Sequence, residues 1–137
     1  MIALIGAGGI AKTHAKAAAA SPEAMRIVAA VDPRDDAKAA FADAADVPFY
    51  ATAEALIAAK RAGEIDVDGV VLCTPPAVRK DVVGPALDAG LHVLVEKPIG
   101  RTEDEANELV SLAEAKGELV TAVGYCHRFT PGLAEMR

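Results

Sequence analysis

A glycine-rich turn close to the start of the sequence constrains the fold more than any other feature. The turn, residues 6–11 (GAGGIA), follows the apolar run Ile2–Ile5 and precedes an alanine-rich stretch from about residue 10 to residue 20. The pattern G-x-G-x-x-A between a strand and a helix is typical of the first unit of a dinucleotide-binding fold. Gly6 permits the tight turn, Gly8 lets backbone amides approach a pyrophosphate, and the helix that follows supplies a partial positive charge.

Beyond this turn, short apolar runs alternate with longer amphipathic stretches, which indicates βαβ units and a parallel sheet. We expect an α/β fold with a doubly wound parallel sheet, six strands, helices on both faces and the strand order 3-2-1-4-5-6. The expected strands are residues 2–5, 26–31, 48–50, 69–73, 92–95 and 119–123. The expected helices are residues 10–20, 35–45, 52–62, 78–89 and 102–117, with Pro131 at the start of another.

The composition agrees with such a fold and argues against several classes of protein. Hydrophobic residues make up 53% of the chain and aromatic residues only 4%, so the core must consist mainly of Ala, Val, Leu and Ile. The formal net charge of −6 argues against nucleic-acid binding, which needs a basic surface. No apolar run approaches the roughly 20 residues of a membrane span, and the N-terminus lacks the basic leader of a signal peptide. We therefore expect a cytoplasmic protein without membrane contact.

The cysteines and histidines are too scattered to indicate a disulfide or a metal site. Cys73 and Cys126 show no CxxC spacing. The strands that they follow should lie about 10 Å apart, and a disulfide bridges at most roughly 7 Å. His14, His92 and His127 share no spacing typical of metal ligands. We expect two free thiols and no bound metal.

An acidic residue stands where a ribose-binding carboxylate is expected. Asp32 ends the second predicted strand, about 20 residues beyond the glycine turn. Its carboxylate can accept hydrogen bonds from the ribose hydroxyls of NAD, and it repels the additional phosphate of NADP. Arg34 follows two residues later, where it can pair with that phosphate or stack on the adenine. The sequence favours NAD and leaves NADP open; the other interpretation is an ordinary βα turn whose Asp caps a helix.

Two further loops leave the carboxyl ends of strands, at the edge where ligands bind in open α/β sheets. Thr74 and Pro75 follow the fourth predicted strand, and Glu96-Lys97-Pro98 follows the fifth. An ammonium group beside a nicotinamide can act as an acid or a base, so Lys97 is the catalytic candidate. The residues expected from these motifs to contact the cofactor are Gly6, Gly8, Gly9, Ile10, Asp32, Arg34, Thr74, Pro75, Glu96 and Lys97.

Five segments, taken together and in order, resemble the Gfo/Idh/MocA family, the group of glucose-fructose oxidoreductase, inositol dehydrogenase and related sugar or polyol dehydrogenases. The segments are residues 6–11, 31–32, 73–76, 89–98 and 123–129. The resemblance implies a nicotinamide cofactor over the sheet edge and hydride transfer between it and a sugar or polyol. It also implies that Lys97 lies near the substrate hydroxyl as part of a proton relay, and that the peptide bond before Pro98 is cis.

The sequence departs from the family pattern at two residues and in its length. Arg79 stands where members often carry His; we expect it in solvent on a helix surface, with contact to a sugar or acid substrate as the alternative. Cys126 stands where Asn is common, at a position that the resemblance implies contacts the cofactor or substrate. Members run well beyond 300 residues. We therefore expect residues 1–124 to form the dinucleotide-binding domain, and residues 125–137 to begin the crossover towards a substrate domain that this sequence does not include.

The leading hypothesis is therefore the cofactor-binding part of an NAD(P)-dependent dehydrogenase. This part alone should be inactive, because nothing covers the nicotinamide. The alternatives are a dinucleotide-binding module without catalysis and an NAD-dependent glycosidase of the same family. A methyltransferase also has a glycine loop and an acid after a strand, but Glu96-Lys97-Pro98 and the spacing of residues 6–11 count against it. An uncovered surface near Lys97 and Tyr125 predicts self-association.

Overall fold

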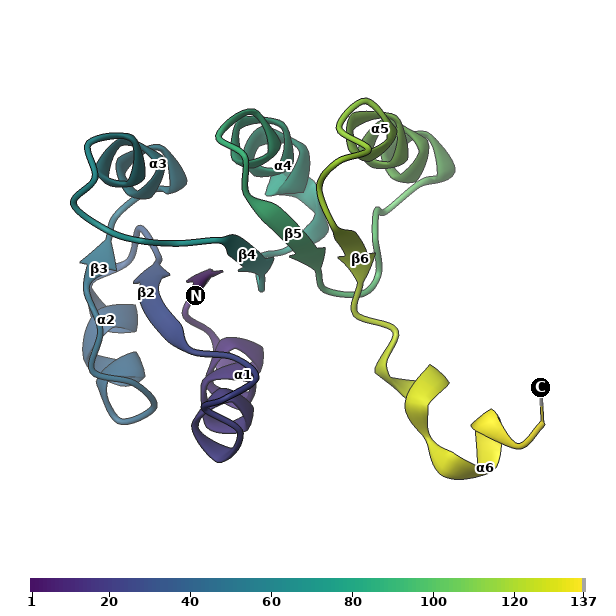
Figure 1. Ribbon diagram of the computed structural model, residues 1–137, viewed down its shortest axis with the longest axis horizontal. Coiled ribbons are helices and arrows are strands. Elements are labelled where there is room, and N and C mark those ends of the chain that lie inside the picture. Colours follow the sequence, from purple (N-terminus) through teal and green to yellow (C-terminus); the bar gives the residue numbers. More distant parts are fainter. Residues whose placement is uncertain (137) are drawn as a thin grey trace.

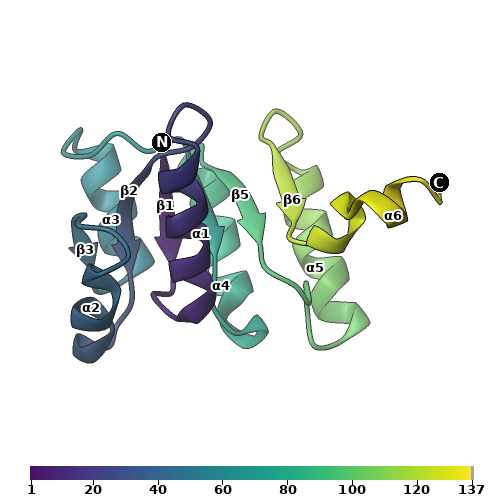
Figure 2. The same cartoon turned by 90° about the horizontal axis from the view of Figure 1, so that it is seen from below.

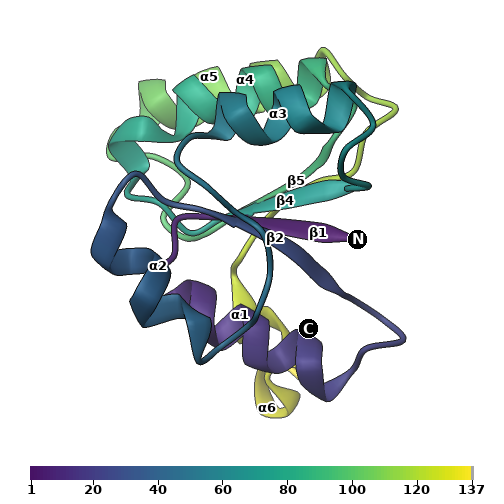
Figure 3. The same ribbon diagram turned by 90° about the vertical axis from the view of Figure 1, so that its left-hand side faces the viewer.

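The computed structural model describes residues 1–136 and consists of a central sheet between two layers of helices (Figure 1, Figure 3). The strands are β1 Ile2–Ile5, β2 Ile27–Val31, β3 Phe49–Tyr50, β4 Gly69–Leu72, β5 His92–Val95 and β6 Thr121–Val123. The α-helices are α1 Gly9–Ala20, α2 Asp35–Ala42, α3 Ala53–Arg61, α4 Arg79–Asp88, α5 Glu103–Glu114 and α6 Pro131–Ala134. Two short 3-10 helices precede α4 and α6, namely η1 Pro76–Val78 and η2 Cys126–Phe129.

The six strands form one parallel sheet in the order β3-β2-β1-β4-β5-β6, which confirms the predicted fold class and topology. At its centre Leu4 of β1 lies opposite Ala30 of β2 and Val71 of β4. Because all strands run in the same direction, their carboxyl ends meet at one edge. The loops predicted to hold a ligand all leave the sheet at this edge.

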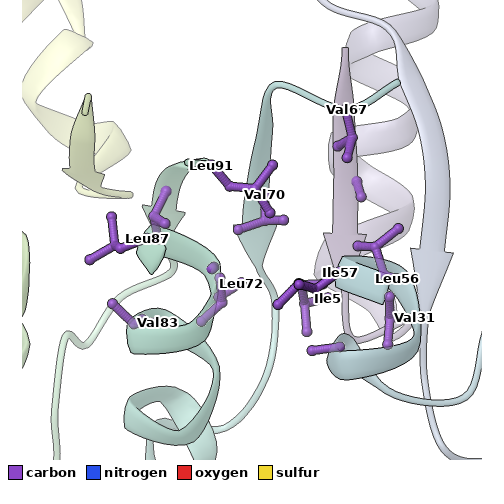
Figure 4. Close-up of a cluster of buried hydrophobic side chains, with 14 of the residues drawn as sticks. Ile5, Val31, Leu56, Ile57, Val67, Val70, Leu72, Val83, Leu87 and Leu91 are labelled. Atoms are coloured by element: carbon purple, nitrogen blue, oxygen red, sulfur yellow. The ribbon is translucent and has the colours of Figure 1, made fainter. Parts of the chain in front are cut away.

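Both faces of the central strands are buried, each under its own layer of helices (Figure 3). Helices α3, α4 and α5 cover one face, where Leu56, Leu72 and Leu87 join α3, β4 and α4 in the larger core cluster (Figure 4). On the other face Phe41 and a group of alanines from α1 and α2 pack against β1 and β2. Alanine lets α1 lie close to the sheet. Strands buried on both faces have continuous apolar runs rather than alternating ones, which is the pattern that the sequence shows.

The layer formed by α1 and α2 does not extend over β5 and β6 (Figure 2). On this face Leu94 of β5 is half-buried and Ala122, its neighbour on β6, is exposed. The chain then passes through η2 to α6, which lies beyond β6 and away from the centre of the sheet (Figure 2). The end of the sheet at β6 therefore carries uncovered apolar surface.

Several predicted elements are slightly shorter than expected, and for α2 and β6 local hydrogen bonds give the reason. Helix α2 ends at Ala42 rather than at residue 45, because two of the following N–H groups bond to the carbonyl of Phe41 and close a turn. Strand β6 begins at Thr121 rather than at Leu119, whose N–H bonds back to Lys116 in the turn after α5. None of these hydrogen bonds is visible in a pattern of apolar residues.

Two local predictions are confirmed by the backbone. The side chain of Thr102 accepts a hydrogen bond from the N–H of Glu105 and so caps the start of α5. The Lys97–Pro98 peptide bond is cis, as the family resemblance implied.

Candidate functional site

The glycine turn joins β1 to α1 and leaves the start of α1 accessible. Gly6 has a φ of +93°, in the left-handed region, and a Cβ there would lie 3.1 Å from the carbonyl carbon of Cys73, so only glycine fits. At Gly8 a Cβ would meet no atom within 4 Å. No side chain caps the helix, and its first turn, which includes Gly9 and Ile10, contains no acid. The free N–H groups and the helix dipole therefore favour an anion at this position.

Asp32 follows β2 beside this turn, and four hydrogen bonds hold its carboxylate. One oxygen accepts from the N–H of Ala7 at 3.0 Å and from Nη2 of Arg34 at 3.1 Å. The other accepts from the N–H of Arg34 at 3.1 Å and from its Nε at 3.0 Å. Burial raises the pKa of Asp32, but the hydrogen bonds from Arg34 and Ala7 outweigh burial and hold the pKa below its ordinary value. The buried carboxylate is therefore charged at neutral pH.

A hollow of about 610 Å³ lies at this edge of the sheet. Six of the residues predicted to contact a cofactor line it, namely Gly6, Gly8, Asp32, Arg34, Thr74 and Pro75. The Thr74 hydroxyl oxygen is buried and has no hydrogen-bond partner among residues 1–136. These residues fit a dinucleotide, because the start of α1 suits its phosphates, Asp32 suits its ribose hydroxyls and Thr74 has an unused hydroxyl.

The Glu96-Lys97-Pro98 turn leaves β5, the strand next to the one that ends before Thr74. Lys97 itself is exposed. Glu96 is buried; its Oε2 accepts from the N–H of Lys97 at 3.2 Å, and its Oε1 lies 2.8 Å from Nε2 of His14. The turn therefore has a fixed backbone and an ammonium group in solvent.

The structure does not bring every predicted residue to the same hollow. Glu96 and Cys126 line a second hollow of about 870 Å³ on the β6 side, and Lys97 lines neither of the two. Cys126 is exposed at the start of η2. Gly9 and Ile10 begin α1 without lining either hollow. The hollow beside Asp32 therefore brings together more of the predicted residues than the hollow on the β6 side.

The expectation that Arg79 lies in solvent is wrong, because its side chain is only 2% exposed. Its Nε and Nη2 donate to the carbonyl of Thr74 at 3.2 and 3.0 Å, and its Nη1 donates to the carbonyl of Pro98. Burial lowers the pKa of Arg79, and the negative charge of Glu96 partly offsets this effect. Arg79 is the first residue of α4, so its side chain can reach the loops on either side of the helix start. It joins the loop after β4 to the loop after β5.

His14 is a residue of the site that the sequence analysis missed. It is separated from Glu96 by 82 positions, and nothing in their spacing connects them. One signal is present: His14 stands between the buried residues Ala11 and Ala15 of α1 and is itself half-buried. A polar side chain near the sheet-facing side of a helix needs a hydrogen-bond partner. That signal predicts that a partner exists but does not identify it.

Both cysteines are free. Burial, together with the negative charge of Glu96, raises the pKa of the Cys73 thiol to about 12, whereas Cys126 is exposed. Among residues 1–136 no cluster of His, Cys, Asp or Glu side chains could hold a metal ion. No helix in the same range is long and apolar enough to cross a membrane.

Comparisons with known proteins identify relatives along the whole chain. Residues 1–125 match a family model described as an oxidoreductase family with an NAD-binding Rossmann fold. The rhizopine catabolism protein MocA of Rhizobium meliloti is 35% identical over 136 residues, which cover 99% of this chain and 40% of the relative. An inositol 2-dehydrogenase of the same species is 33% identical over 135 residues, covering 98% of this chain and 38% of the relative. The chain spans about two fifths of the length of these curated relatives.

Solved structures share the fold. The UDP-N-acetylglucosamine 3-dehydrogenase GnnA of Acidithiobacillus ferrooxidans superposes with a TM-score of 0.80 at 28% identity, over 99% of this chain and 40% of that chain. The WlbA dehydrogenase of Bordetella pertussis, solved with NADH and UDP-GlcNAcA, superposes with a TM-score of 0.86 at 23% identity, over 98% of this chain and 39% of that chain. At 23% identity the similarity to the WlbA dehydrogenase concerns the fold alone.

The region matched by the family model begins at Met1 and ends at Tyr125, so it includes the glycine turn, Asp32 and the turn that carries Lys97. The motifs that resemble the family, the strand order and the matched region all agree. The chain belongs to the Gfo/Idh/MocA oxidoreductase family, and residues 1–125 are the NAD-binding Rossmann domain of that family.

Proposed function

We propose that this chain is the cofactor-binding part of an NAD-dependent dehydrogenase that oxidises a sugar or polyol. The observation that carries the proposal is the arrangement at one sheet edge. The glycine turn, Asp32 and Thr74 surround one hollow. Lys97 lies in the loop after β5, the strand next to β4, which Thr74 follows. The names of two relatives, both inositol 2-dehydrogenases, support a polyol as the class of substrate.

The preference for NAD rests on Asp32 and its pair with Arg34. The buried carboxylate accepts hydrogen bonds readily, and its charge repels a phosphate on the adenosine ribose. The backbone N–H, Nε and Nη2 of Arg34 all donate to Asp32, so the guanidinium lies beside the carboxylate whose charge repels that phosphate. The pair therefore favours a ribose with free hydroxyls.

Lys97 is the proposed acid–base residue. When bound, the nicotinamide ring supplies the acceptor for the hydride of the alcohol. Oxidation of an alcohol also releases the hydroxyl proton, and a neutral amine at the Lys97 position can take it up. The hydrogen bond from the N–H of Lys97 to Glu96 holds the backbone, while the side chain is free to reach a substrate above the sheet edge.

Residues 1–124 are the proposed domain, and residues 125–137 the proposed start of a connection to a substrate domain. Alone, the chain should bind cofactor without oxidising any sugar. Hydride transfer requires both reactants in contact and water excluded, whereas the Lys97 side chain is exposed to solvent.

The test compares binding and turnover. The 137-residue chain, mixed with NAD and a panel of inositols and sugars, should bind the cofactor and produce no NADH absorbance.

In a protein that carries a substrate domain after residue 137, Lys97→Ala should lower kcat by roughly 10²-fold or more and leave the Kd for NADH nearly unchanged. Lys80→Ala, at an exposed position on α4, is the matched control. Equal losses of affinity and turnover would make Lys97 a cofactor anchor, and robust turnover by the isolated chain would refute the proposal.

A further inference from the structure

Apart from Asp32, two charged side chains are buried within residues 1–136, and both are attached to the turn that carries Lys97. Arg79 is 2% exposed and Glu96 is 7% exposed. A buried charge costs free energy unless hydrogen bonds and an opposite charge compensate it. The proposed function assigns no chemical step to either side chain. Another role must therefore account for the burial of these two charges.

Arg79 holds the turn from the face of the sheet that α3, α4 and α5 cover. All of its hydrogen bonds within the described residues go to two loop carbonyls, those of Thr74 and Pro98. A guanidinium group is planar and presents its donors in a rigid fork. The fork therefore fixes the distance between the loop after β4 and the loop after β5.

His14 holds the same turn from the opposite face, which α1 covers (Figure 3). Its Nε2 lies 2.8 Å from Oε1 of Glu96, and Oε2 of Glu96 accepts the N–H of Lys97. Gly124 backs this carboxylate so closely that a Cβ there would lie 3.3 Å from Oε1. The carboxylate consequently has a partner at each oxygen and little room to move.

We propose that Arg79 and His14 are positioning residues that hold residues 96–98 from the two faces of the sheet, and so fix the place of Lys97. Arg79 acts on the residue after Lys97, through the carbonyl of Pro98, and His14 acts on the residue before it, through Glu96. Neither needs to touch cofactor or substrate. The inference rests on the proposed role of Lys97, because only then does the position of this turn matter for a reaction.

We call the contacts of Arg79 and His14 to residues 96–98 the clamp. Hydrogen exchange of backbone amides tests the clamp in the 137-residue chain without cofactor. Arg79→Met keeps the length of the side chain and removes its donors, and His14→Leu removes the contact to Glu96. Each variant should raise the exchange rates of the amides of residues 97 and 99–101 by roughly 10-fold or more and leave the amides of β1 and β4 unchanged. The conservative variants Arg79→Lys and His14→Gln, which keep a donor, should restore much of the protection.

Two exposed lysines on the same helices supply matched controls. Lys80→Met and Lys16→Met should exchange like the unmodified chain throughout. The clamp is refuted if the amides of residues 97 and 99–101 keep their protection in Arg79→Met and His14→Leu. It is also refuted if β1 and β4 lose protection by the same factor, because that result means general destabilisation. If Arg79→Met does not fold, His14→Leu, which removes the other contact to the turn, still decides between these outcomes.

A parallel titration with NADH separates this inference from the proposed function. Failure of the unmodified chain to bind NADH would refute the cofactor role and leave the exchange result intact. Unchanged exchange in the variants, with normal NADH binding by the unmodified chain, would refute the clamp alone. Specific loss of protection at residues 97 and 99–101 that the conservative variants restore would establish it.

Discussion

Asp32 is fully hydrogen-bonded by its own chain, so a ribose must compete for its carboxylate. The competition concerns Arg34, whose side chain is 60% exposed, and not the backbone N–H of Ala7. An ion pair with one exposed partner contributes little free energy, because solvent screens it and the long side chain loses entropy. Displacing the guanidinium from Asp32 is therefore inexpensive, and the freed Arg34 remains at the wall of the hollow, where the adenine is expected.

Asp32→Ser tests this account of cofactor choice. The unmodified chain should bind NADH more tightly than NADPH. The variant should raise the Kd for NADH by roughly 10-fold, about 1.4 kcal/mol, because a charged acceptor is lost. NADPH should be affected less, since the repulsion of its phosphate is lost as well. Fluorescence titration measures both constants, with Asp36→Ser in the first turn of α2 as the control. Tighter binding of NADPH by the unmodified chain would contradict the assignment and give Arg34 the leading role.

The two thiols should differ sharply in reactivity. Only a thiolate attacks an alkylating or disulfide reagent, and burial beside Glu96 raises the pKa of Cys73 to about 12. Cys126 is exposed at the start of η2. At pH 8 a thiol reagent should therefore label one cysteine rapidly, and peptide mapping should identify it as Cys126. Cys73 should react only after denaturation. The variant Cys126→Ser should abolish the rapid phase, and a rapid phase that survives in it would contradict the assignment.

At the scale of elements, the junction of β1 and α1 contains two glycines with different roles. Gly6 is needed for folding, and Gly8 is needed for binding of the cofactor. Gly6→Ala places a Cβ in a left-handed backbone conformation and against the carbonyl of Cys73, so it should lower the free energy of unfolding by about 1–3 kcal/mol. Gly8→Ala places its methyl group in open space beside the start of α1, so stability should change little. The Kd for NADH should nevertheless rise at Gly8→Ala, because the methyl group blocks the approach of the phosphates.

Urea denaturation and NADH titration of both variants distinguish these effects, and each variant serves as the control for the other. Weaker NADH binding at Gly8→Ala without loss of stability is the expected result. If Gly8→Ala binds NADH as the unmodified chain does, the cofactor phosphates lie elsewhere.

The sequence predicts elements better than it predicts the contacts between them. The strands and helices follow from the periodicity of apolar residues, and the strand order follows from the spacing of the glycine turn and Asp32. The end of α2 depends on hydrogen bonds to Phe41 that no periodicity records. Arg79 and His14 meet partners that lie 19 and 82 positions away, at a sheet edge that exists only after folding. Such pairs follow from tertiary structure and have no local signal.

At the scale of the whole molecule, the sheet is covered unevenly. Helices α3, α4 and α5 lie along one face of the sheet, but the layer of α1 and α2 on the other face does not extend over β5 and β6 (Figure 1, Figure 2). Two exposed aromatic side chains of the segment after β6, those of Tyr125 and Phe129, line the same hollow as Leu94 and Ala122. We call these residues, with Leu94 and Ala122, the open face. The chain spans about two fifths of the length of its curated relatives, and in them further protein is available to cover such a surface.

The open face predicts that the 137-residue chain associates with itself. Apolar side chains gathered in one patch gain free energy when a second copy removes them from water, whereas isolated ones do not. Light scattering during gel filtration should give a mass that rises with concentration above the 14.0 kDa of one chain. The double substitution Tyr125→Ser with Phe129→Ser should return the mass to that of a monomer, because it removes the two most exposed aromatic side chains of the patch. Ile10→Ser, which removes an exposed apolar side chain from the start of α1, should leave association unchanged. A chain that stays monomeric at every concentration would show that the open face is stable in water.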